Sequence, residues 1–546
     1  MKNNLATAVK LSEQRIWRGL GIWNLYFIIK LALYLTGFIN FDVFYNILFA
    51  AFLLLPLGFN SLRILRNIIA LPIAVALLYY DSWLPPFKRL LEQPEVLSFS
   101  NDYLIELFLR FINWNLLGAG LIIIVVYSFL AQWLRMTTWT LLALLLVALP
   151  NVASMPRVLW NDSSEKFATA VNISNDRPTT LEPRSGDINT VLNQELELFY
   201  QNEQQRVTAF PLPVADAAPF DLLFINICSL SWSDLEVTQL VEHPLFARMD
   251  IVFDQFNSAT SYSGPSVLRL MRASCGQSPH DELYTEADSQ CYLFKNLKQL
   301  GFAGSAALNH TGEFEGFIDD INLAGFSAPA LVPSNLRPKL KSFDATPIWG
   351  DYDTLKLWWD DRLEKKTPAE VLLYNSISLH DGNREATADG GSRSAPYEQR
   401  AKRLLDELNA FMTELEASGR QVMLVFVPEH GAALEGDRMQ IAGMREIPTP
   451  DITHVPVAVR LIGTKSAEPA HPLHVSTPTS FLALSELVAR VLSRDVFAQE
   501  NIDWPELVVD LPETRVVSEN SGTVMMTYQG EPYIRLGERD WVKYAR

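Results

Sequence analysis

Cysteine is scarce in this chain, whose 546 residues include only Cys228, Cys275 and Cys291. Three cysteines allow at most one disulfide within the chain. Cys275 and Cys291 flank a polar segment, and we expect them to pair in an oxidising compartment. Closing such a loop stabilises a fold by about 3 kcal/mol. Cys228 is then left over, as either an inert core residue or a metal ligand.

A basic balance, internal repeats and low-complexity tracts are also missing. The net charge of −17 gives no reason to expect a nucleic-acid partner. The chain is too long for one domain. Hydrophobic residues make up 49% of it although 20% is charged, so the apolar residues must be concentrated in one region. That region lies before residue 156.

The N-terminal region contains five apolar segments, each near the ~20 residues that cross a bilayer core. No small-residue cleavage site follows the first segment, so we do not expect a cleaved signal peptide. This segment includes Lys30, which should face other helices rather than lipid. The expected spans are Leu20–Ile39, Val43–Phe59, Ile64–Tyr80, Leu116–Leu134 and Thr137–Met155.

Basic residues around these segments predict the orientation of the chain. With the N-terminus in the cytoplasm, seven basic residues lie inside and three outside. An odd number of spans then places the long C-terminal part outside. We therefore predict a transmembrane domain over 1–155, a polar, irregular linker or ordered strap over 156–215, and an outer domain over 216–546.

The outer domain alternates strands with helices, which predicts an α/β fold around a parallel sheet. The expected strands include 251–256, 371–379, 422–428 and 457–462, and the expected helices include 397–418 and 479–492. The last strands, 523–528, 532–536 and 541–544, are separated by turn residues. They predict an antiparallel meander on a sheet edge.

The stretch Phe220–Trp232 is the centre of this domain. Polar and apolar residues do not alternate over 220–228, so this part is predicted to be a strand buried on both faces. Cys228 stands at its carboxyl end, where open α/β sheets bind ligands. A buried core cysteine is the alternative.

Three more strand ends carry reactive side chains. Ser263 precedes Gly264-Pro265 at a predicted helix start, where Pro265 fits the first helical position and orphan N–H groups favour a phosphate. A simple N-cap serine is the alternative, and Ser261 and Ser266 are rival hydroxyls. The other strand ends carry His380 and the adjacent Glu429 and His430. Each signal is weak alone, because solvated loops and hydrogen-bonded histidines are common.

We expect these four strand ends to converge on one edge of the sheet. The Cys228 thiolate, the Glu429 carboxylate and the His430 imidazole would make three zinc ligands, and a nucleophile oxygen can fill the fourth position. The sequence therefore predicts a site in which zinc activates the hydroxyl of Ser263.

This arrangement resembles the membrane-bound phosphoethanolamine transferases of the alkaline phosphatase superfamily. Most of those enzymes have Glu and Thr where this chain has Cys228 and Ser263, and their late His motif is missing near 476–481. With those departures, the chain is similar to the BcsG family, the cellulose phosphoethanolamine transferases of bacterial cellulose synthesis. The resemblance is carried by Asn226–Trp232, Phe256–Pro265, Arg272–Gln277, Pro428–Gly431, Pro478–Ala483 and Val517–Ser521.

The resemblance implies an alkaline-phosphatase-like, sulfatase-like periplasmic domain on a multi-pass bacterial inner-membrane anchor. Phosphatidylethanolamine would be the donor, the 6-hydroxyl of glucose units in nascent cellulose the acceptor, and subunits of the cellulose synthase complex the partners. Transfer would be ping-pong, with Ser263 as nucleophile and Cys275–Cys291 as the family's disulfide. One zinc ion per chain would bind Cys228, Ser263, Glu429 and His430, and the phosphate site would be lined by Tyr262, His380 and Arg445.

Two other functions stay open at this point. A phosphatase or sulfatase-like hydrolase of the same fold would usually hold two metals, whereas the sequence offers convincing ligands for one. A non-catalytic assembly subunit of a polysaccharide synthase would work through its spans and need no metal. The zinc content of the outer domain would separate the three.

Overall fold

A computed structural model describes residues 19–57, 59–84, 103–105, 109, 114–149, 187–210, 219–313, 316–323, 326, 330–469 and 471–544. The chain divides into two compact units, each described by itself below. The first comprises Met1–Gln93, Glu106–Arg184 and Asp437–Ile441, and the second comprises Pro94–Ile105, Ser185–Gly436 and Ala442–Arg546.

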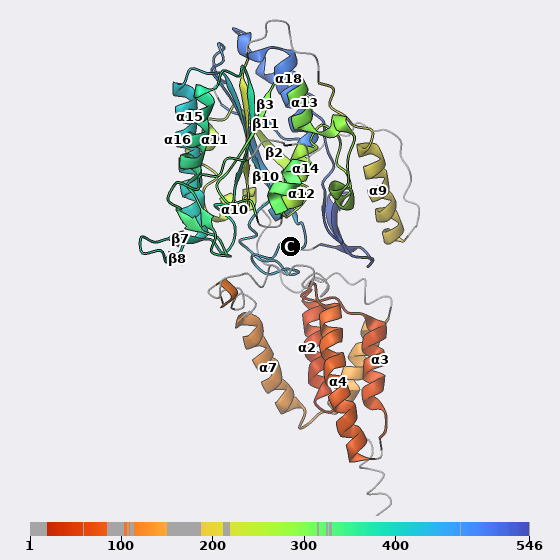
Figure 1. Cartoon of the computed structure of the whole chain (residues 1–546). Helices are drawn as coiled ribbons and strands as arrows, with labels where there is room; N and C mark the ends of the chain where they lie inside the picture. Colours follow the sequence, from red (N-terminus) through yellow and green to blue (C-terminus); the bar gives the residue numbers. More distant parts are fainter. Residues whose placement is uncertain are drawn as a thin grey trace, which may run out of the picture. The chain divides into compact units, whose positions relative to one another are not determined.

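Each of the five predicted spans overlaps a helix of the first unit (Figure 1). Among the described residues, one stretch, Ser61–Asp81, is long and apolar enough to cross a membrane, and the other four helices are shorter but apolar. The number of spans therefore stays a prediction. The helices are α2 (Trp23–Leu35), α3 (Val43–Leu54), α4 (Asn60–Asp81), α7 (Trp114–Leu130) and α8 (Met136–Val147).

Lys30 is buried inside this unit, as expected. Its Nζ lies 2.8 Å from Asp81 Oδ2, and it donates to Asn46 Oδ1 at 2.8 Å and to the carbonyl of Leu77 at 3.2 Å. Asn46 Nδ2 donates to Asp81 Oδ2 at 2.7 Å. This polar network joins α2, α3 and α4, and it removes the cost of an unpaired charge among apolar helices.

The second unit is built on a mixed sheet, so the prediction of a parallel sheet is wrong for one strand. Among the described residues, seven strands follow the order β11-β2-β10-β9-β1-β6-β3. Strand β10 is antiparallel to both neighbours, whereas β9, β1, β6 and β3 pair in parallel. The strands are β1 (Asp221–Ile227), β2 (Ile251–Asn257), β3 (Ala303–Leu308), β6 (Glu370–Ser376), β9 (Val422–Pro428), β10 (His454–Ile462) and β11 (Leu473–Val475).

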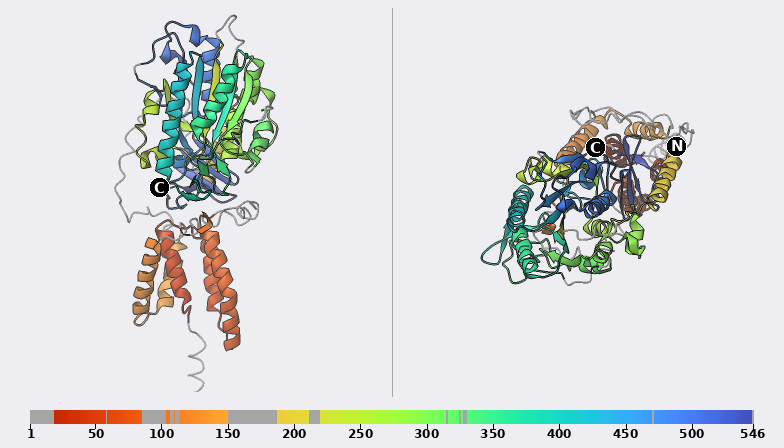
Figure 2. Two further views of the ribbon diagram at one scale, coloured as in Figure 1. Left: turned by 60° about the vertical axis from the view of Figure 1, so that its left-hand side comes forward. Right: turned by 90° about the horizontal axis from the view of Figure 1, so that it is seen from above.

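Helices cover both faces of this sheet and give the unit three layers (Figures 1 and 2). In α16 (Tyr397–Ala417), which the sequence predicts to be amphipathic, Leu404, Leu408 and Phe411 are buried on one stripe. Gly419 follows the C-cap of this helix with a φ of +69°. One face is covered by α10 (Trp232–Val237), α11 (Pro244–Ala247), α15 (Asp351–Glu364) and α16 (Tyr397–Ala417). The other face is covered by α12 (Ser263–Met271), α13 (Leu293–Gln299), α14 (Phe317–Leu323) and α18 (Phe481–Ser493).

The segment 156–215, predicted to be a polar linker or an ordered strap, includes α9 (Ile188–Glu203), a helix that belongs to the second unit. Its Leu192, Leu196 and Phe199 are buried at helical spacing and pack with Val517 and Met526 of the C-terminal tail. The tail is the predicted antiparallel meander, but it forms its own sheet instead of an edge of the main one. Its strands are β12 (Val517–Asn520), β13 (Thr523–Tyr528), β14 (Glu531–Leu536) and β15 (Val542–Lys543).

Cys275 and Cys291 form the predicted disulfide, sixteen residues apart in the sequence. The bridge closes the connection between α12 and α13, two helices on the same face of the sheet. It therefore restrains the end of α12, the helix whose first residue is Ser263. Smaller elements of the unit are β4 (Leu340–Lys341), β5 (Pro347–Ile348), β7 (Arg384–Ala386), β8 (Ser392–Ser394), α17 (Pro450–Thr453) and α19 (Trp504–Val508).

Candidate active site

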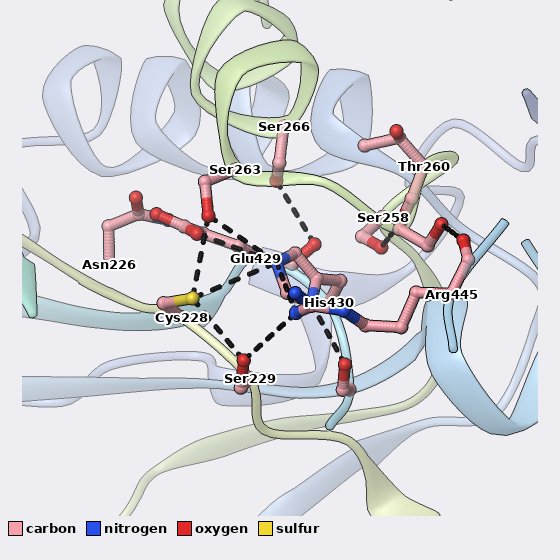
Figure 3. A network of polar contacts seen from close by, with 12 residues as sticks. Asn226, Cys228, Ser229, Ser258, Thr260, Ser263, Ser266, Glu429, His430 and Arg445 are labelled. Atoms are coloured by element: carbon pink, nitrogen blue, oxygen red, sulfur yellow. Dashed lines mark hydrogen bonds and ion pairs between the residues drawn. The ribbon is translucent and has the colours of Figure 1, made fainter. Parts of the chain in front are cut away.

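The carboxyl ends of two neighbouring parallel strands bring three potential metal ligands together. Cys228 follows β1, and Glu429 and His430 follow β9, with the N–H of Glu429 donating to the carbonyl of Ile227 at 2.8 Å. The Cys228 thiol, the Glu429 carboxylate and the His430 imidazole are buried, and their ligand atoms lie within 4.8 Å of one another (Figure 3).

Ser263 reaches the same place from β2 through the start of α12. Its Oγ lies 3.4 Å from Cys228 Sγ and 3.4 Å from His430 Nε2. The helix begins at Ser263, with Tyr262 as its N-cap, so Pro265 is the third helical residue and not the first as predicted. The hydroxyl thus stands at the positive end of the helix, beside backbone N–H groups that have no partner within it.

The two rival hydroxyls are committed elsewhere. Ser261 Oγ donates to the carbonyl of Arg445 and accepts from Asn520 Nδ2 at 2.6 Å. Ser266 is buried, and its Oγ donates to the carbonyl of Glu429 at 3.0 Å. Of these three serines, therefore, Ser263 is the one whose hydroxyl contacts the potential ligands.

The spacing of these atoms fits a tetrahedral zinc ion. Zinc bonds of about 2.0–2.3 Å separate ligand atoms by roughly 3.3–3.8 Å in a tetrahedron. The two Ser263 contacts are 3.4 Å, Cys228 Sγ is 3.8 Å from His430 Nε2, and His430 Nε2 is 3.9 Å from Glu429 Oε2. Glu429 Oε2 is buried and accepts no hydrogen bond from any described residue. A thiol, a carboxylate and an imidazole are also the ligand types that zinc prefers.

Burial controls the protonation of this cluster. It raises the pKa of the Cys228 thiol to about 12, with a further contribution from the Glu429 charge. It also raises the pKa of Glu429 and lowers that of His430, which Arg445 lowers further. Without a cation, the site therefore favours a neutral thiol and a neutral imidazole. A divalent cation would favour the thiolate, because a coordinated thiol loses its proton.

Two asparagines that the sequence analysis missed orient the Glu429 carboxylate. Asn375 Nδ2 donates to Glu429 Oε1 at 2.5 Å and to Asn226 Oδ1 at 2.8 Å, and His310 Nε2 lies 2.8 Å from Asn375 Oδ1. Asn226 and Asn375 are paired across β1 and β6, near the carboxyl ends of both strands. Asn is depleted in strands, so two buried asparagines in apolar strands were a usable signal for polar contacts at this edge.

Asp234 holds the two ligand-bearing loops against each other. Its Oδ2 accepts from the N–H and the Oγ of Ser231, each at 2.9 Å, and from the N–H of Ala432 at 2.7 Å. Gly431 lies between these loops, where a Cβ would be 2.6 Å from Ser231 Oγ, so only glycine fits. The neighbouring Ser229 has a φ of +64°, a strained conformation that turns the chain directly after Cys228.

Arg445 and Tyr262 lie at the same site. Arg445 Nη1 donates to Ser229 Oγ at 3.1 Å and lies 3.4 Å from His430 Nε2, and its guanidinium is 5.8 Å from the centre of the Tyr262 ring. The Tyr262 hydroxyl donates to Glu446 Oε2 at 3.2 Å. Arg445 thus supplies a positive charge next to the metal ligands, where a phosphoryl group would need one.

His380 is placed less directly. Its Nδ1 lies 2.8 Å from the carbonyl oxygen of Asp381, its ring packs on Phe343, and its own carbonyl accepts from Arg400 at 3.1 Å. Burial, with Arg445, lowers the pKa of His380 to about 4, so the imidazole is neutral at neutral pH. No hydrogen bond between described residues joins it to Ser263.

Comparisons with known proteins identify the family. A family model described as the cellulose biosynthesis protein BcsG C-terminal domain matches residues 178–541, and one described as the BcsG N-terminal domain matches residues 23–149. This chain belongs to the BcsG family. It is 44% identical to cellulose biosynthesis protein BcsG of Escherichia coli K12 over an alignment of 560 positions, which covers 99% of both chains. It is 42% identical to BcsG of Salmonella typhimurium over 549 residues, which cover 97% of both.

Among solved structures, one match is a protein of the alkaline phosphatase superfamily from Vibrio parahaemolyticus. The TM-score is 0.46 and the identity 11%, covering 64% of this chain and 87% of that one. A TM-score below 0.5 is too low to carry an argument. Membership in the BcsG family therefore rests on the sequence comparisons.

Proposed function

We propose that this BcsG-family protein transfers phosphoethanolamine from phosphatidylethanolamine to the 6-hydroxyl of glucose units in nascent cellulose. The observation that carries the proposal is the Ser263 hydroxyl at the start of α12, 3.4 Å from both the Cys228 thiol and the His430 imidazole. The chain belongs to a family of cellulose biosynthesis proteins, which supports a glucan as the acceptor. The apolar helices of the first unit support a lipid donor.

One zinc ion per chain would be held by Cys228, Glu429, His430 and the oxygen of Ser263. When bound, zinc supplies the positive charge that favours loss of the Ser263 proton and that offsets the charge of the phosphoryl group. The buried Glu429 oxygen without a hydrogen bond supports a cation at this position. The described residues offer one such group of potential ligands, which is enough for one metal ion. This favours the transferase over a hydrolase that holds two metals.

The remaining steps belong to the residues of the chain. Ser263 Oγ attacks phosphorus, the Oγ–P bond forms, and the P–O bond to diacylglycerol breaks as the leaving alkoxide takes up a proton. A glucose 6-hydroxyl then attacks the same phosphorus, loses its proton and displaces Ser263. Arg445 neutralises phosphoryl charge, and Tyr262 and His380 line the phosphate site.

The same proposal assigns the location and the partners. The first unit would be a multi-pass anchor in the bacterial inner membrane, and the second unit would be an alkaline-phosphatase-like domain in the periplasm. There it would meet the glucan as the cellulose synthase complex delivers it. A lipid donor and a polymer that leaves the membrane would both be within reach of an anchored enzyme.

A reconstituted reaction tests this function. The full-length protein, in vesicles of labelled phosphatidylethanolamine, is given cellooligosaccharides, and its zinc content is measured. We expect one zinc per chain and oligosaccharides heavier by one phosphoethanolamine on a 6-hydroxyl. Free phosphoethanolamine with no glucan product, and two metals per chain, would favour a hydrolase. No metal and no product would favour a non-catalytic subunit.

A further inference from the structure

A carboxylate lies beside the residue that follows Ser263. Helix α14 packs against α12 (Figure 1), and Asp320 of α14 faces Gly264. A methyl group built on Gly264 would be 3.5 Å from Asp320 Oδ2, and apart from the flanking residues and the backbone of α12 no other described atom lies within 4 Å. Among the described residues, the space next to the start of α12 is therefore open and is bordered by a carboxylate.

Asp320 has no partner for this charge among the described residues. It makes no hydrogen bond and no ion pair with them, and its side chain is only partly exposed. Burial and the neighbouring Asp319 raise its pKa. A half-buried carboxylate without a partner is unfavourable, and a ligand cation would relieve the cost.

A negative charge is unexpected at a site for phosphoryl transfer. Apart from the Glu429 carboxylate, which is one of the proposed zinc ligands, the charges near Ser263 suit an anion, since Arg445 lies next to His430 and the start of α12 is positive. A carboxylate would repel a simple phosphate monoester. It would not repel a donor that carries its own positive group at the right distance from phosphorus.

Phosphoethanolamine is such a donor. Four single bonds separate its phosphorus from its nitrogen, a span of roughly 4–6 Å. Asp320 Oδ2 lies within about 5 Å of the Gly264 Cα, which follows the Ser263 Cα at 3.8 Å along the chain. The ammonium of a phosphoethanolamine group near Ser263 can therefore reach Asp320.

We propose that Asp320 binds the primary ammonium of phosphoethanolamine and selects donors that carry it. The inference rests on the proposed function and deepens it, because it names the group that distinguishes this headgroup from other phosphodiesters. Asp320 acts as a specificity-determining residue, and Gly264 keeps open the space into which the ammonium fits.

Two soluble donors of matched shape test the assignment on the full-length protein in detergent. One is p-nitrophenyl phosphoethanolamine, and the other is p-nitrophenyl propyl phosphate, in which a methyl replaces the ammonium. Attack by Ser263 forms the Oγ–P bond and releases p-nitrophenolate from either donor. We expect Asp320→Asn to lower kcat/KM about tenfold for the ammonium donor, as expected for one charged hydrogen bond, and to change it less than about twofold for the propyl donor, which lacks the ammonium.

Asp319→Asn is the matched control, because Asp319 is exposed on the same helix and its substitution removes the same negative charge. It should leave both donors unaffected. An equal loss of both donors in Asp320→Asn, no loss of either, or a wild-type protein without preference for the ammonium would overturn the role of Asp320 while the transferase stands. A wild-type protein that releases p-nitrophenolate from neither donor would overturn the proposed function, and this inference with it.

Discussion

Two buried carboxylates lie at opposite ends of strand β1, and they differ in how their charge is compensated. At its start, Asp221 Oδ1 accepts from Arg362 at 3.0 and 2.8 Å and from the N–H of Glu370 at 2.9 Å, and Oδ2 accepts from Arg420 at 2.9 Å. Just after its other end, across from Cys228, Glu429 Oε1 accepts from Asn375, while Oε2 accepts nothing from the described residues.

This difference separates a structural ion pair from a ligand site. Removing a carboxylate from water costs several kcal/mol unless cations and hydrogen bonds replace the water. For Asp221, two guanidinium groups do so within the fold. For Glu429 Oε2, no described residue does so, and with the neighbouring thiol and imidazole a metal ion is the partner that we propose. Four changes test this contrast, from the largest expected effect to the smallest.

Removing the thiol should abolish metal binding. We expect Cys228→Ala to fold but to retain less than about a tenth of one zinc, and to lose transfer by about 10³-fold or more, since charge stabilisation at the phosphoryl group goes with the metal. Zinc is measured by mass spectrometry on the purified protein, and folding by circular dichroism. Full zinc in a folded Cys228→Ala protein would make Cys228 an ordinary core residue.

Removing the carboxylate at the other end of β1 should affect stability and leave the metal alone. Asp221→Asn removes the carboxylate closest to the buried Arg362 and leaves it only the Glu370 carboxylate at 3.5 Å, which should cost about 3 kcal/mol of unfolding free energy. Arg420→Ala is the milder companion, because the Arg420 side chain is 30% exposed; about 1 kcal/mol is expected. Denaturant unfolding measures both. If Asp221→Asn lost its zinc at unchanged stability, the two ends of β1 would not differ as described.

Loosening the Glu429 carboxylate should weaken the metal site without emptying it. Asn375→Ala removes the donor to Glu429 Oε1, and such losses of orienting hydrogen bonds typically lower metal affinity about 10–100-fold. Competition with a fluorescent chelator gives the affinity. The control is Asn296→Ala, since Asn296 bonds to Ser274 and Gln290. Unchanged affinity in Asn375→Ala would mean that Glu429 needs no orientation or is not a ligand.

A third carboxylate, that of the half-buried Glu407, extends the comparison to pH. Glu407 accepts from the N–H of Tyr352, and among the described residues no Lys or Arg pairs with it. Burial, with the charge of Asp351, raises its pKa to about 7. A raised pKa favours the protonated folded state, so this contribution to stability is complete below the unfolded pKa of about 4.5 and is lost as pH rises through about 7.

Glu407→Gln should therefore lessen the fall in Tm between pH 5 and pH 8. One proton can change the unfolding free energy by at most about 1.4 kcal/mol per pH unit, so this effect is the smallest when it is measured over a single pH unit. Parallel melting curves of the two proteins across that range provide the comparison. An identical slope for both would show that Glu407 is already ionised at pH 5.

Much of this site follows from residue patterns, because the strands that carry it are continuous apolar runs. The strand 422–428 has the predicted bounds, the helix begins at Tyr397 as predicted and ends one residue early, and parallel neighbours place the residues after β1 and β9 at one edge. The ligands and Ser263 come together for that reason. Ser263 could be separated from Ser261 only by the structure, because both follow β2 and spacing alone does not say which hydroxyl turns toward Cys228.

Other features are not local in the sequence. The direction of β10 depends on how its connection returns to the sheet, and a fully buried strand has the same pattern either way. The sequence of helix α9 is mostly polar, because its apolar stripe is narrow. The sheet on which this stripe packs comes more than 300 residues later in the chain, so the local sequence does not reveal it. The supporting side chains, such as Asp234, act through backbone N–H groups of loops that lie far apart in the sequence.

Mapping the covalent adduct tests the central claim most directly. The full-length protein is incubated with phosphatidylethanolamine in the absence of glucan, and its peptides are analysed by mass spectrometry. We predict one phosphoethanolamine on Ser263, which disappears in Ser263→Ala and is passed on when cellooligosaccharides are added. An adduct on Ser261 or Ser266, or transfer that survives in Ser263→Ala, would contradict it.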